Sequence, residues 1–525
     1  MRRSLAFGTS LLLAVYAACS AAQADDDLVV TLLFTNDMES AYDPVPAWWR
    51  DDIERIGGLA QLSTLIKEIR RDEPNVFLFD SGDIFTGALS QVTNGELMFE
   101  FMMTMGYDAM AIGNHEFDYN ETVLQWQKNR VSFPVLGANL FYKETKHPYA
   151  QPHTIIERGD VRIGVVGTLG QDAAATAIAK DHIDELDVTS PAVAAQRSVD
   201  EIIDEVDLVV LLTHQGHTAP MQTDAEADSR LDRDINEDIE LADSVTGIDV
   251  LFGGHADAGT WAPVTSPKHG TLIMQTFGQA TYLGYLQLTL DGDTREIVAY
   301  DGKLVPVDAG RLEPDPVIER KYNAYRAAHP DITKVVGRAE SRMNRKYFDE
   351  STIGNLLTDI MAEMTGADMA LLGSGAIRAD LPAGDVEISD ALDINPFIDP
   401  TVVVRMTGAQ LVEAMEQSFT QLRGLLQVSG LEVVYDLSQP EYQRAVSITH
   451  NGREIEPAET YLVSVARFLA MGGDHYDVFA ETTIVSEHEA LGELMIEYFR
   501  KHEIVPAPAL GRQTDLARTA QVAQP

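Results

Sequence analysis

Cysteine and basic residues are both scarce in this chain of 525 residues. Cys19 is the only cysteine, so the chain cannot form an internal disulfide, and cysteine carries none of its chemistry. Lys and Arg number 39 against 82 Asp and Glu, which gives a formal net charge of −43. Such an acidic excess argues against nucleic-acid polymers and anionic membranes as partners. We expect the acids to aid solvation in salty surroundings, with the gathering of cations as the alternative.

Long apolar runs are absent after residue 24, so no membrane-spanning helix is expected there. Residues 1–24 have the features of a secretory signal peptide: two arginines at the start, the apolar stretch LAFGTSLLLAVYAA, and a small-residue cleavage site that ends at Ala24. Cleavage after Ala24 predicts a periplasmic or secreted protein. Cleavage before Cys19 is the less favoured alternative, and it would produce a lipid-anchored lipoprotein.

Strand-like and helix-like segments alternate from Leu28 to about Tyr300. The segments IGGLAQLSTLIKEIRRDEP, GELMFEFMMTMGYD and SPAVAAQRSVDEIIDEV are predicted helices, the second of them ending near Gly106. This alternation predicts an α/β sandwich. Pro and Gly then interrupt it, and a charged helix is expected over 316–329, closed by Pro330.

A second domain is predicted from about Thr333 to Leu516. It is expected to open with a helix around Gly354–Thr365, followed by strands at DMALLG, VSGLEVVYDL and YLVSVARFL. The chain contains no internal repeat, and its last residues, RTAQVAQP, have the composition of a disordered tail.

Polar residues that bind metals follow five of the short apolar runs in the first half of the chain. The runs LVVTLLF, NVFLF, AMAIG, DLVVLLT and VLF are predicted buried strands. Open α/β sheets collect ligands at the carboxyl ends of such strands. Carboxylate, amide and imidazole groups gathered there predict a metal site, and their number favours two metals. The residues are Asp37, Asp83, Asn114, His214, His255 and Asp257.

Five short segments then give a family resemblance. TNDMES, DSGD, GNHEFD, LLTHQGH and GGHAD resemble the calcineurin-like metallophosphoesterases, and in particular the secreted 5′-nucleotidase/UDP-sugar hydrolase family. GNHEFD is the most specific of them, and the resemblance extends over nearly all of the chain after the signal peptide. It implies an α/β fold with a four-layer α/β/β/α metallophosphoesterase sandwich and a smaller α/β substrate-specificity domain. The expected parts are a signal peptide (1–24), a phosphoesterase domain (25–312), an interdomain helix (313–332), a substrate-binding domain (333–516) and a disordered tail (517–525).

The resemblance also implies two divalent metal ions that share Asp83. Asp37, Glu39, Asp83 and Asp257 would surround one ion, and Asp83, Asn114, His214 and His255 the other. Glu39 stands where the family usually has His, and Asp257 where it has His or Gln. The first site would then be all carboxylate, which favours Mn²⁺ or Mg²⁺ over Zn²⁺. In the alternative, Glu39 and Asp257 are solvated loop acids and the site holds one metal.

The resemblance implies a catalytic pair in His115 and Asp118. In the family this histidine, oriented by the aspartate, steadies charge on the transferring phosphoryl group, and the nucleophile is a metal-bound water or hydroxide. A structural role for His115 is the alternative. Glu116 is expected to be structural, and His217 to be solvated or indirectly involved.

The second domain resembles the C-terminal domain of the same family through GNLL, INPFIDP and FLAMGGD. The resemblance implies that Arg378 contacts a phosphate, that Phe468 stacks on a base and that Asp474 accepts from ribose hydroxyls. In the alternatives, Phe468 is a core aromatic and Asp474 forms a turn. A second aromatic is expected near residues 425–428, where none is present, and the arginine expected just before Gly354 is missing. Arg342 or Arg345 would be its substitute.

The leading prediction is a secreted or periplasmic enzyme that hydrolyses nucleoside 5′-monophosphates and related nucleotides. The expected partner is therefore a small nucleotide, and the oligomeric state stays open. The alternatives within the same fold are 2′,3′-cyclic nucleotides, nucleotide sugars or a thiohydrolase reaction. A non-catalytic metal or nucleotide binder is a further alternative, against which the presence of both His115 and Asp118 argues.

Overall fold

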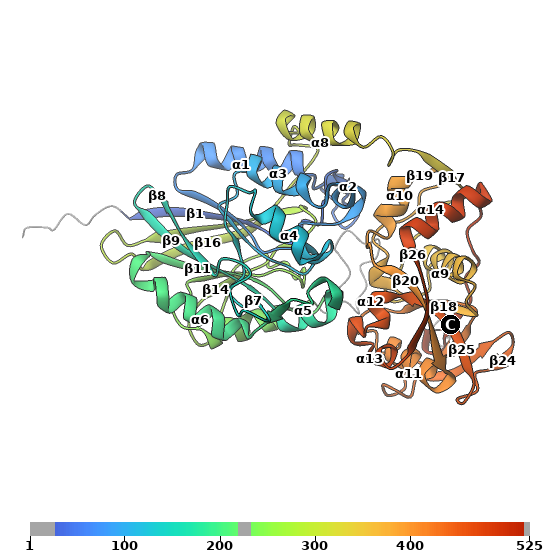
Figure 1. Ribbon diagram of the computed structural model, residues 1–525. Helices are drawn as coiled ribbons and strands as arrows, with labels where there is room; N and C mark the ends of the chain where they lie inside the picture. The colour runs from blue at the N-terminus through green and yellow to red at the C-terminus, as the bar shows by residue number, and fades with distance from the viewer. Residues whose placement is uncertain (1–26, 219–232, 519–525) are drawn as a thin grey trace, which may run out of the picture.

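The computed structural model describes residues 27–218 and 233–518, which form two lobes (Figure 1). The first lobe contains two six-stranded sheets, and the second contains a five-stranded sheet with smaller sheets around it. Helix α8 (Pro316–Ala328) lies along the first lobe and leads into the second (Figure 1). It begins at a proline, and the Asp315 side chain caps its first turn by accepting from Val317 N–H. The predicted helix over 316–329 is therefore present.

The first sheet has the strand order β16-β15-β1-β4-β5-β6. β4 pairs in parallel with both β1 and β5, whereas β15 runs antiparallel to β1. The bounds are β16 (Ile297–Pro306), β15 (Tyr282–Leu290), β1 (Leu28–Thr35), β4 (Val76–Asp80), β5 (Ala109–Ala111) and β6 (Val135–Leu136). Its central strands are buried on both faces, as their continuous apolar sequences predict.

The second sheet has the order β13-β14-β12-β11-β9-β8, and its central strands β14, β12, β11 and β9 are parallel. The bounds are β13 (Val264–Thr265), β14 (Leu272–Met274), β12 (Val250–Phe252), β11 (Leu208–His214), β9 (Val161–Leu169) and β8 (His153–Arg158). β11 is fully buried along its length.

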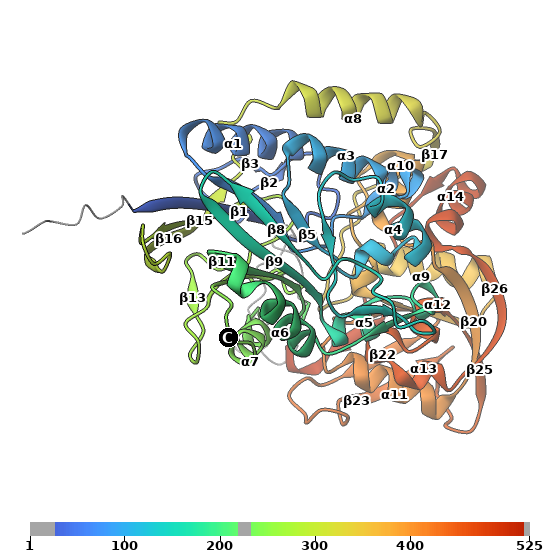
Figure 2. The same cartoon turned by 60° about the vertical axis from the view of Figure 1, so that its left-hand side comes forward.

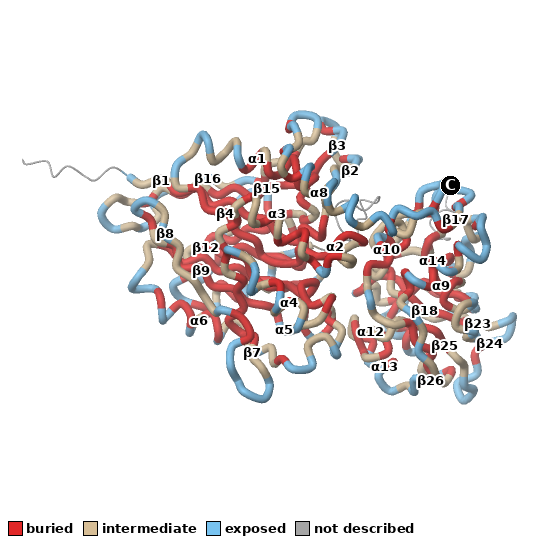
Figure 3. The backbone as a smooth tube through the Cα atoms, turned by 45° about the horizontal axis from the view of Figure 1, so that its top comes forward, coloured by how far each residue is buried: buried red, intermediate tan, exposed pale blue. Residues whose placement is uncertain are grey.

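The two sheets pack face to face, with helices on both outer faces (Figure 2). The rings of Phe34 and Phe252, one from each sheet, stack with centroids 4.0 Å apart. α1 (Leu59–Asp72) and α3 (Glu96–Met105) pack on the outer face of the first sheet, and α6 (Pro191–Ile202) and α7 (Asn236–Ser244) on that of the second. Figure 3 shows the buried backbone concentrated in these central layers. The predicted four-layer sandwich is confirmed.

Shorter elements complete the first lobe around the strand ends. They are β2 (Val45–Pro46), β3 (Arg55–Ile56), α2 (Gly87–Thr93), the 3-10 turn η1 (His115–Phe117), α4 (Asn120–Lys128), β7 (Leu140–Tyr142), α5 (Gln171–Ala177), η2 (Lys180–His182), β10 (Leu186–Val188) and η3 (Ile203–Glu205). Helix α3 ends at Gly106, which adopts the left-handed conformation at φ 74°.

The second lobe is built on a sheet of order β21-β18-β25-β20-β26. Its strands are β21 (Leu426–Ser429), β18 (Met369–Gly373), β25 (Thr460–Ala466), β20 (Pro400–Thr407) and β26 (Thr483–Ala490). One face packs on α9 (Thr352–Thr365), α10 (Ile388–Ile394) and α14 (Leu491–His502), and the other on α11 (Gly408–Ser418), α12 (Arg467–Ala470) and α13 (Asp477–Ala480). The smaller pieces are β17 (Val335–Ala339), η4 (Ser374–Ala376), β19 (Gly384–Glu387), β22 (Glu432–Tyr435), β23 (Ala445–His450), β24 (Arg453–Glu454), η5 (Gly473–His475), β27 (Ile504–Val505) and β28 (Gln513–Asp515).

Two predicted strands of the second lobe differ from the structure. VSGLEVVYDL is divided at Gly430, whose φ of 76° turns the chain, so that β21 and β22 belong to different sheets. YLVSVARFL leaves the sheet at Arg467 and continues as helix α12. Apolar periodicity over so few residues does not distinguish a strand from the first turn of a helix.

The predicted signal peptide and most of the predicted tail lie outside the described residues. Within 27–218 and 233–518, every helix is too short or too polar to cross a bilayer.

Candidate functional site

The carboxyl ends of five strands meet at one edge of the sandwich and bring the predicted ligands together. Three of these side chains follow strands of the first sheet: Asp37 comes after β1, Asp83 after β4 and Asn114 after β5. His214 ends β11 and His255 follows β12 in the second sheet. All of them are buried. The predicted convergence of the strand ends therefore occurs across both sheets.

Unusual backbone conformations hold several of these residues in place. Non-glycine residues rarely adopt positive φ, and such residues cluster at functional sites when the surrounding structure stabilises them. Backbone hydrogen bonds link the loops here, from Asp37 N–H to the Gly82 carbonyl (2.9 Å) and from Glu39 N–H to the Asp83 carbonyl (3.0 Å). The candidates with positive φ are Asp37 (49°), Glu39 (43°), Asp83 (61°), His255 (75°) and Asp257 (49°).

His214, Asp83 and Asn114 form the tightest part of the site. His214 Nε2 lies 3.0 Å from Asp83 Oδ2 and 3.1 Å from Asn114 Oδ1. On the other side of the ring, Nδ1 lies 2.8 Å from the Ser81 carbonyl, which fixes the ring orientation in the way common for metal-binding histidines. One ligand atom each from Asp83, His214 and His255 lies within 4.8 Å of the others, close enough to share an ion.

The chemistry of these side chains fits divalent metal ions. His255 Nε2 and Asp257 Oδ1 are buried without a hydrogen-bond partner among the described residues. Burial raises the pKa of Asp37 to about 7 and that of Asp257 well above its ordinary range, because crowded carboxylates lose their solvation. Burial acts on Asp83 in the same direction, but the charges of His214 and His115 outweigh it and lower its pKa. Bound cations would compensate such buried negative charge.

His115 lies beside this cluster on the turn η1. Its Nδ1 is 3.1 Å from both carboxylate oxygens of Asp118, as the predicted pair requires. Its Nε2 is 3.7 Å from Glu39 Oε1 and 3.9 Å from Asp83 Oδ2. Burial lowers the pKa of His115, but the charges of Asp118 and Asp83 outweigh it and raise the pKa to about 9. The ring can therefore donate a proton or a hydrogen bond toward the metal cluster.

Glu116 is structural, as expected. Its carboxylate is fully buried and accepts backbone N–H groups of Asp83 (2.9 Å), Ile84 (2.8 Å) and Gly113 (2.5 Å). These bonds tie the loop after β4 to the loop after β5. A side chain on Gly113 would bring a Cβ within 2.3 Å of Asp83 Oδ1, so glycine is required there.

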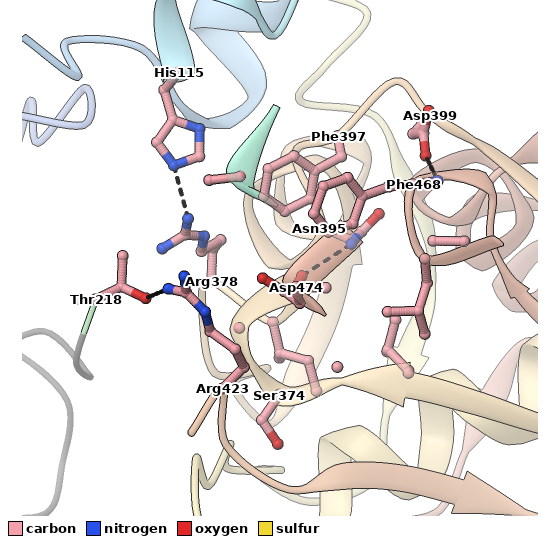
Figure 4. Close-up of a pocket in the computed structure, with 18 of the residues that line it drawn as sticks. His115, Thr218, Ser374, Arg378, Asn395, Phe397, Asp399, Arg423, Phe468 and Asp474 are labelled. Carbon is pink, nitrogen blue, oxygen red and sulfur yellow. Dashed lines mark hydrogen bonds between the residues drawn. The ribbon is translucent and has the colours of Figure 1, made fainter. Parts of the chain in front are cut away.

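A cavity of about 220 Å³ lies between the two domains and is lined by residues of both. The first domain contributes the predicted ligands except His214, together with His115 and Asp118, and the second contributes Arg378, Phe468 and Asp474. Arg378 Nη2 lies 2.9 Å from His115 Nε2 (Figure 4). Its Nη1 lies 3.5 Å from Glu39 Oε1. The domains thus meet directly at the candidate site.

Residues 425–428, where a second aromatic was expected, contain none, and another aromatic side chain lines the cavity. Leu425, Leu426 and Val428 are core residues, and the cavity is lined instead by Phe397, which comes from INPFIDP after α10 (Figure 4). Its ring centroid is 6.1 Å from that of His115 and 5.6 Å from Arg378 Cζ. The sequence signal for Phe397 was its position after a proline and outside any periodic apolar run. An aromatic in such a position is not predicted to pack in the core, so it is a candidate for a binding site.

The missing arginine is not replaced by Arg342. The Arg342 side chain is 69% exposed and pairs with Asp380 at 2.7 Å. Arg345 lines the cavity, and its Nη1 lies 3.2 Å from the Ile377 carbonyl. Arg423 also lines the cavity, and sequence reasoning missed it because it lies in a loop without a recognised motif. His217 lies near Glu237 (3.9 Å) with its side chain 61% exposed.

Two family models match the chain in succession. The calcineurin-like phosphoesterase model matches residues 30–256, and the 5′-nucleotidase C-terminal domain model matches residues 332–481. The first contains all the predicted ligands except Asp257, and the second contains Arg378, Phe468 and Asp474. The phosphoesterase match implies divalent metals.

Several relatives match this chain over nearly their whole length. Protein UshA of Yersinia enterocolitica is 26% identical over 91% of this chain and 92% of the relative, and the 5′-nucleotidase of Vibrio vulnificus is also 26% identical over 91% and 92%. The crystal structure of a 5′-nucleotidase precursor from Thermus thermophilus superposes with a TM-score of 0.79 at 26% identity, covering 93% of this chain and 99% of that one. The sulfate thiohydrolase SoxB of Thermus thermophilus shares the fold, with a TM-score of 0.74 at 18% identity over 93% and 97%. The chain therefore belongs to the 5′-nucleotidase family, in which a calcineurin-like phosphoesterase domain precedes a 5′-nucleotidase C-terminal domain.

Proposed function

We propose that this protein is a metal-dependent phosphoesterase that hydrolyses nucleoside 5′-monophosphates and related nucleotides. One observation carries the proposal: a single cavity is lined by the candidate ligands and His115 of the first domain and by Arg378, Phe468 and Asp474 of the second. A nucleotide has a phosphate at one end and a base at the other, so it needs such a two-sided site. The similarity to 5′-nucleotidases over about nine-tenths of the chain supports the same reaction.

Two divalent ions would be held by the predicted ligand sets that share Asp83. When bound, they would make a water nucleophile available near neutral pH and neutralise charge on the phosphoryl group. Glu39 and Asp257 make one ligand set all carboxylate, so we propose Mn²⁺ or Mg²⁺ at that site, with Zn²⁺ possible at the site that contains His214 and His255. The ligands are Asp37, Glu39, Asp83 and Asp257 in one set and Asp83, Asn114, His214 and His255 in the other.

His115 and Arg378 would act on the phosphoryl group. Asp118 holds Nδ1 of His115, which directs Nε2 toward the cavity. From there the imidazole would donate to an oxygen of the phosphoryl group as its negative charge grows. Arg378 contacts the same ring and would bind the same group through charge-assisted hydrogen bonds.

The nucleoside would bind to the second domain. Phe468 and Phe397 line the cavity and offer aromatic faces for a base, which implies a complete stacking site rather than half of one. Asp474 is held at φ 54° on η5 and would accept hydrogen bonds from the ribose hydroxyls. These contacts would fix the nucleotide while the metal side performs hydrolysis.

A panel of substrates and metals tests the proposal. Hydrolysis is measured as phosphate released from AMP, UMP released from UDP-glucose, nucleoside monophosphate formed from 2′,3′-cyclic AMP and p-nitrophenol released from bis-p-nitrophenyl phosphate, each with added Mn²⁺, Mg²⁺ or Zn²⁺. The proposal expects AMP to give the highest kcat/KM. A preference for the cyclic nucleotide, the nucleotide sugar or the diester would assign the fold to that substrate instead, and no turnover with any metal would favour a binding protein.

We also propose that the two domains span residues 25–312 and 333–516 and are joined by the helix region 313–332. We further propose that residues 1–24 direct secretion. The mass of the protein recovered from periplasm or culture medium tests the cleavage after Ala24. A lipid-modified Cys19 at the mature N-terminus would show the lipoprotein alternative instead.

A further inference from the structure

Arg423 is a deeply buried arginine on the wall of the cavity. It lies between α11 and β21 in the second domain, and it is only 7% exposed. Arginine is almost never this buried unless its charge is compensated. Figure 4 shows its guanidinium on the same side of the cavity as Arg378, and both residues line the space that the candidate metal ligands also line.

The first domain holds most of the Arg423 guanidinium. Nη1 donates to Thr218 Oγ1 (2.6 Å), and Nη2 lies 3.2 Å from Thr176 Oγ1 and 3.3 Å from Asp172 Oδ2. Its Nε is buried and has no acceptor among the described residues. A buried donor without an acceptor costs free energy, which a bound anion would recover. The guanidinium is therefore fixed in place while its Nε–H still lacks an acceptor among the described residues.

Arg423 shares the cavity with residues of both domains. The candidate metal ligands Asp83 and His255 line this cavity together with Arg423 and Asp474. Burial raises the pKa of Asp474, and the charge of Arg423 opposes that rise more than any other charge does. Arg423 thus lines the same cavity as the candidate metal cluster and the proposed ribose site, and the phosphate of a bound nucleotide would lie between these two.

We propose that Arg423 is a second phosphate-binding residue that contacts the substrate's phosphoryl oxygens together with Arg378. The inference rests on the proposed nucleotidase function and extends it, because the arginine expected before Gly354 is missing. Two guanidinium groups at one oxyanion supply several charge-assisted hydrogen bonds. Because the contact is to phosphate, its contribution is independent of the base.

Arg423→Gln and Asp172→Asn separate phosphate binding from bracing of the two domains. Both variants remove the Arg423–Asp172 pair, but only the first removes the guanidinium. We expect Arg423→Gln to raise the inhibition constant of inorganic phosphate about tenfold to a hundredfold and to lower kcat/KM by a similar factor for AMP and for ribose 5-phosphate. Asp172→Asn is expected to stay within about twofold of the wild type in both measurements.

Two results would overturn the inference. An unchanged inhibition constant for phosphate in Arg423→Gln would show that Arg423 does not bind it, and an equal loss in Asp172→Asn would show a brace between the domains. If Arg423→Gln does not fold, phosphate binding to Arg423→Lys decides: at least fivefold weaker binding supports the inference, and unchanged binding refutes it. Failure of the proposed function is distinct, because the wild-type protein itself would then hydrolyse no nucleotide.

Discussion

Arg378 of the second domain donates from Nη2 to Nε2 of His115 in the first, across 2.9 Å. A guanidinium can only donate, so the imidazole must accept through an unprotonated Nε2 in this contact. The pKa of about 9 at His115 instead favours a ring that carries both protons, because Asp118 and Asp83 lie close to it. A doubly protonated imidazole and the guanidinium are both cations and both only donate, so they repel each other unless an anion lies between them. A phosphoryl oxygen would accept from both. We therefore interpret Arg378 and His115 as a phosphate-binding pair whose members contact each other directly.

Replacement of His115 tests the catalytic pair. We expect His115→Ala to lower kcat for AMP by about a hundredfold to ten-thousandfold with a smaller change in KM, since a proton donor acts mainly in the transition state. The control is His217→Ala, because the side chain of His217 is 61% exposed. Steady-state phosphate release measures both variants. Full activity in His115→Ala would reject the proposed role.

The two phenylalanines of the cavity are expected to differ in their effects. Phe468→Ala should raise KM for AMP about tenfold to a hundredfold, since stacking on a base contributes about 1–3 kcal/mol. Phe397→Ala should raise KM and also lower kcat, because its ring lies 6.1 Å from that of His115. Ribose 5-phosphate, which lacks a base, is the control substrate for Phe468→Ala and should be hydrolysed as by the wild type. An equal loss with both substrates would indicate damage to the cavity instead.

The carboxylate-rich ligand set predicts a metal preference. Protein stripped with a chelator should regain more activity with Mn²⁺ than with Zn²⁺, because hard oxygen ligands favour Mn²⁺. The double variant Glu39→His with Asp257→His should bind zinc more tightly, measured as zinc per chain by mass spectrometry after dialysis. Asp51→His, at an exposed acid, is the control. Two tightly bound zinc ions in the wild type would contradict the prediction.

Asp238 predicts a pH-dependent stability. Burial raises its pKa from the ordinary 3.8 to about 8, and Gln275 Nε2 donates to its Oδ2 at 3.0 Å. Below 3.8 the carboxyl is protonated in both folded and unfolded chains. Between 3.8 and about 8 only the unfolded chain loses this proton, so stability should fall as pH rises, by roughly 1 kcal/mol per pH unit, and the loss should level off above 8.

Asp238→Asn removes this titration while it keeps an acceptor for Gln275. The melting temperature of the variant, relative to the wild type, should therefore rise steadily from pH 5 to pH 8. Glu240→Gln, at an exposed position of the same helix, is the control and should show no such trend. Parallel melting profiles for Asp238→Asn and the wild type would show that the buried carboxyl does not govern stability in this range.

The first domain was largely predictable from local sequence. Short apolar runs predicted strands β1, β4, β5, β11 and β12, and the polar residues after them predicted where ligands gather. The reason is that a strand buried on both faces has a continuous apolar sequence, and the ends of parallel strands meet at one edge. Glu116 was also expected to be structural, and its three backbone hydrogen bonds agree.

Local sequence was enough to predict the alternating α/β elements and the strand-end residues, because both follow from residues near one another in the chain or from strand order. The four-layer arrangement and the pairing of His115 with Asp118 were expected from the family resemblance of motifs such as GNHEFD. Two sets of contacts became apparent only in the folded chain: Arg378, 263 residues after His115, contacts its ring, and Phe397 and Arg423 line the same cavity. These contacts depend on how the two domains pack against each other, and packing between domains leaves no periodicity in the sequence of either domain. Phe468 was expected in a strand because apolar periodicity over so few residues does not distinguish a strand from a helix, but the chain leaves the sheet at Arg467 and this ring lines the cavity from a helix.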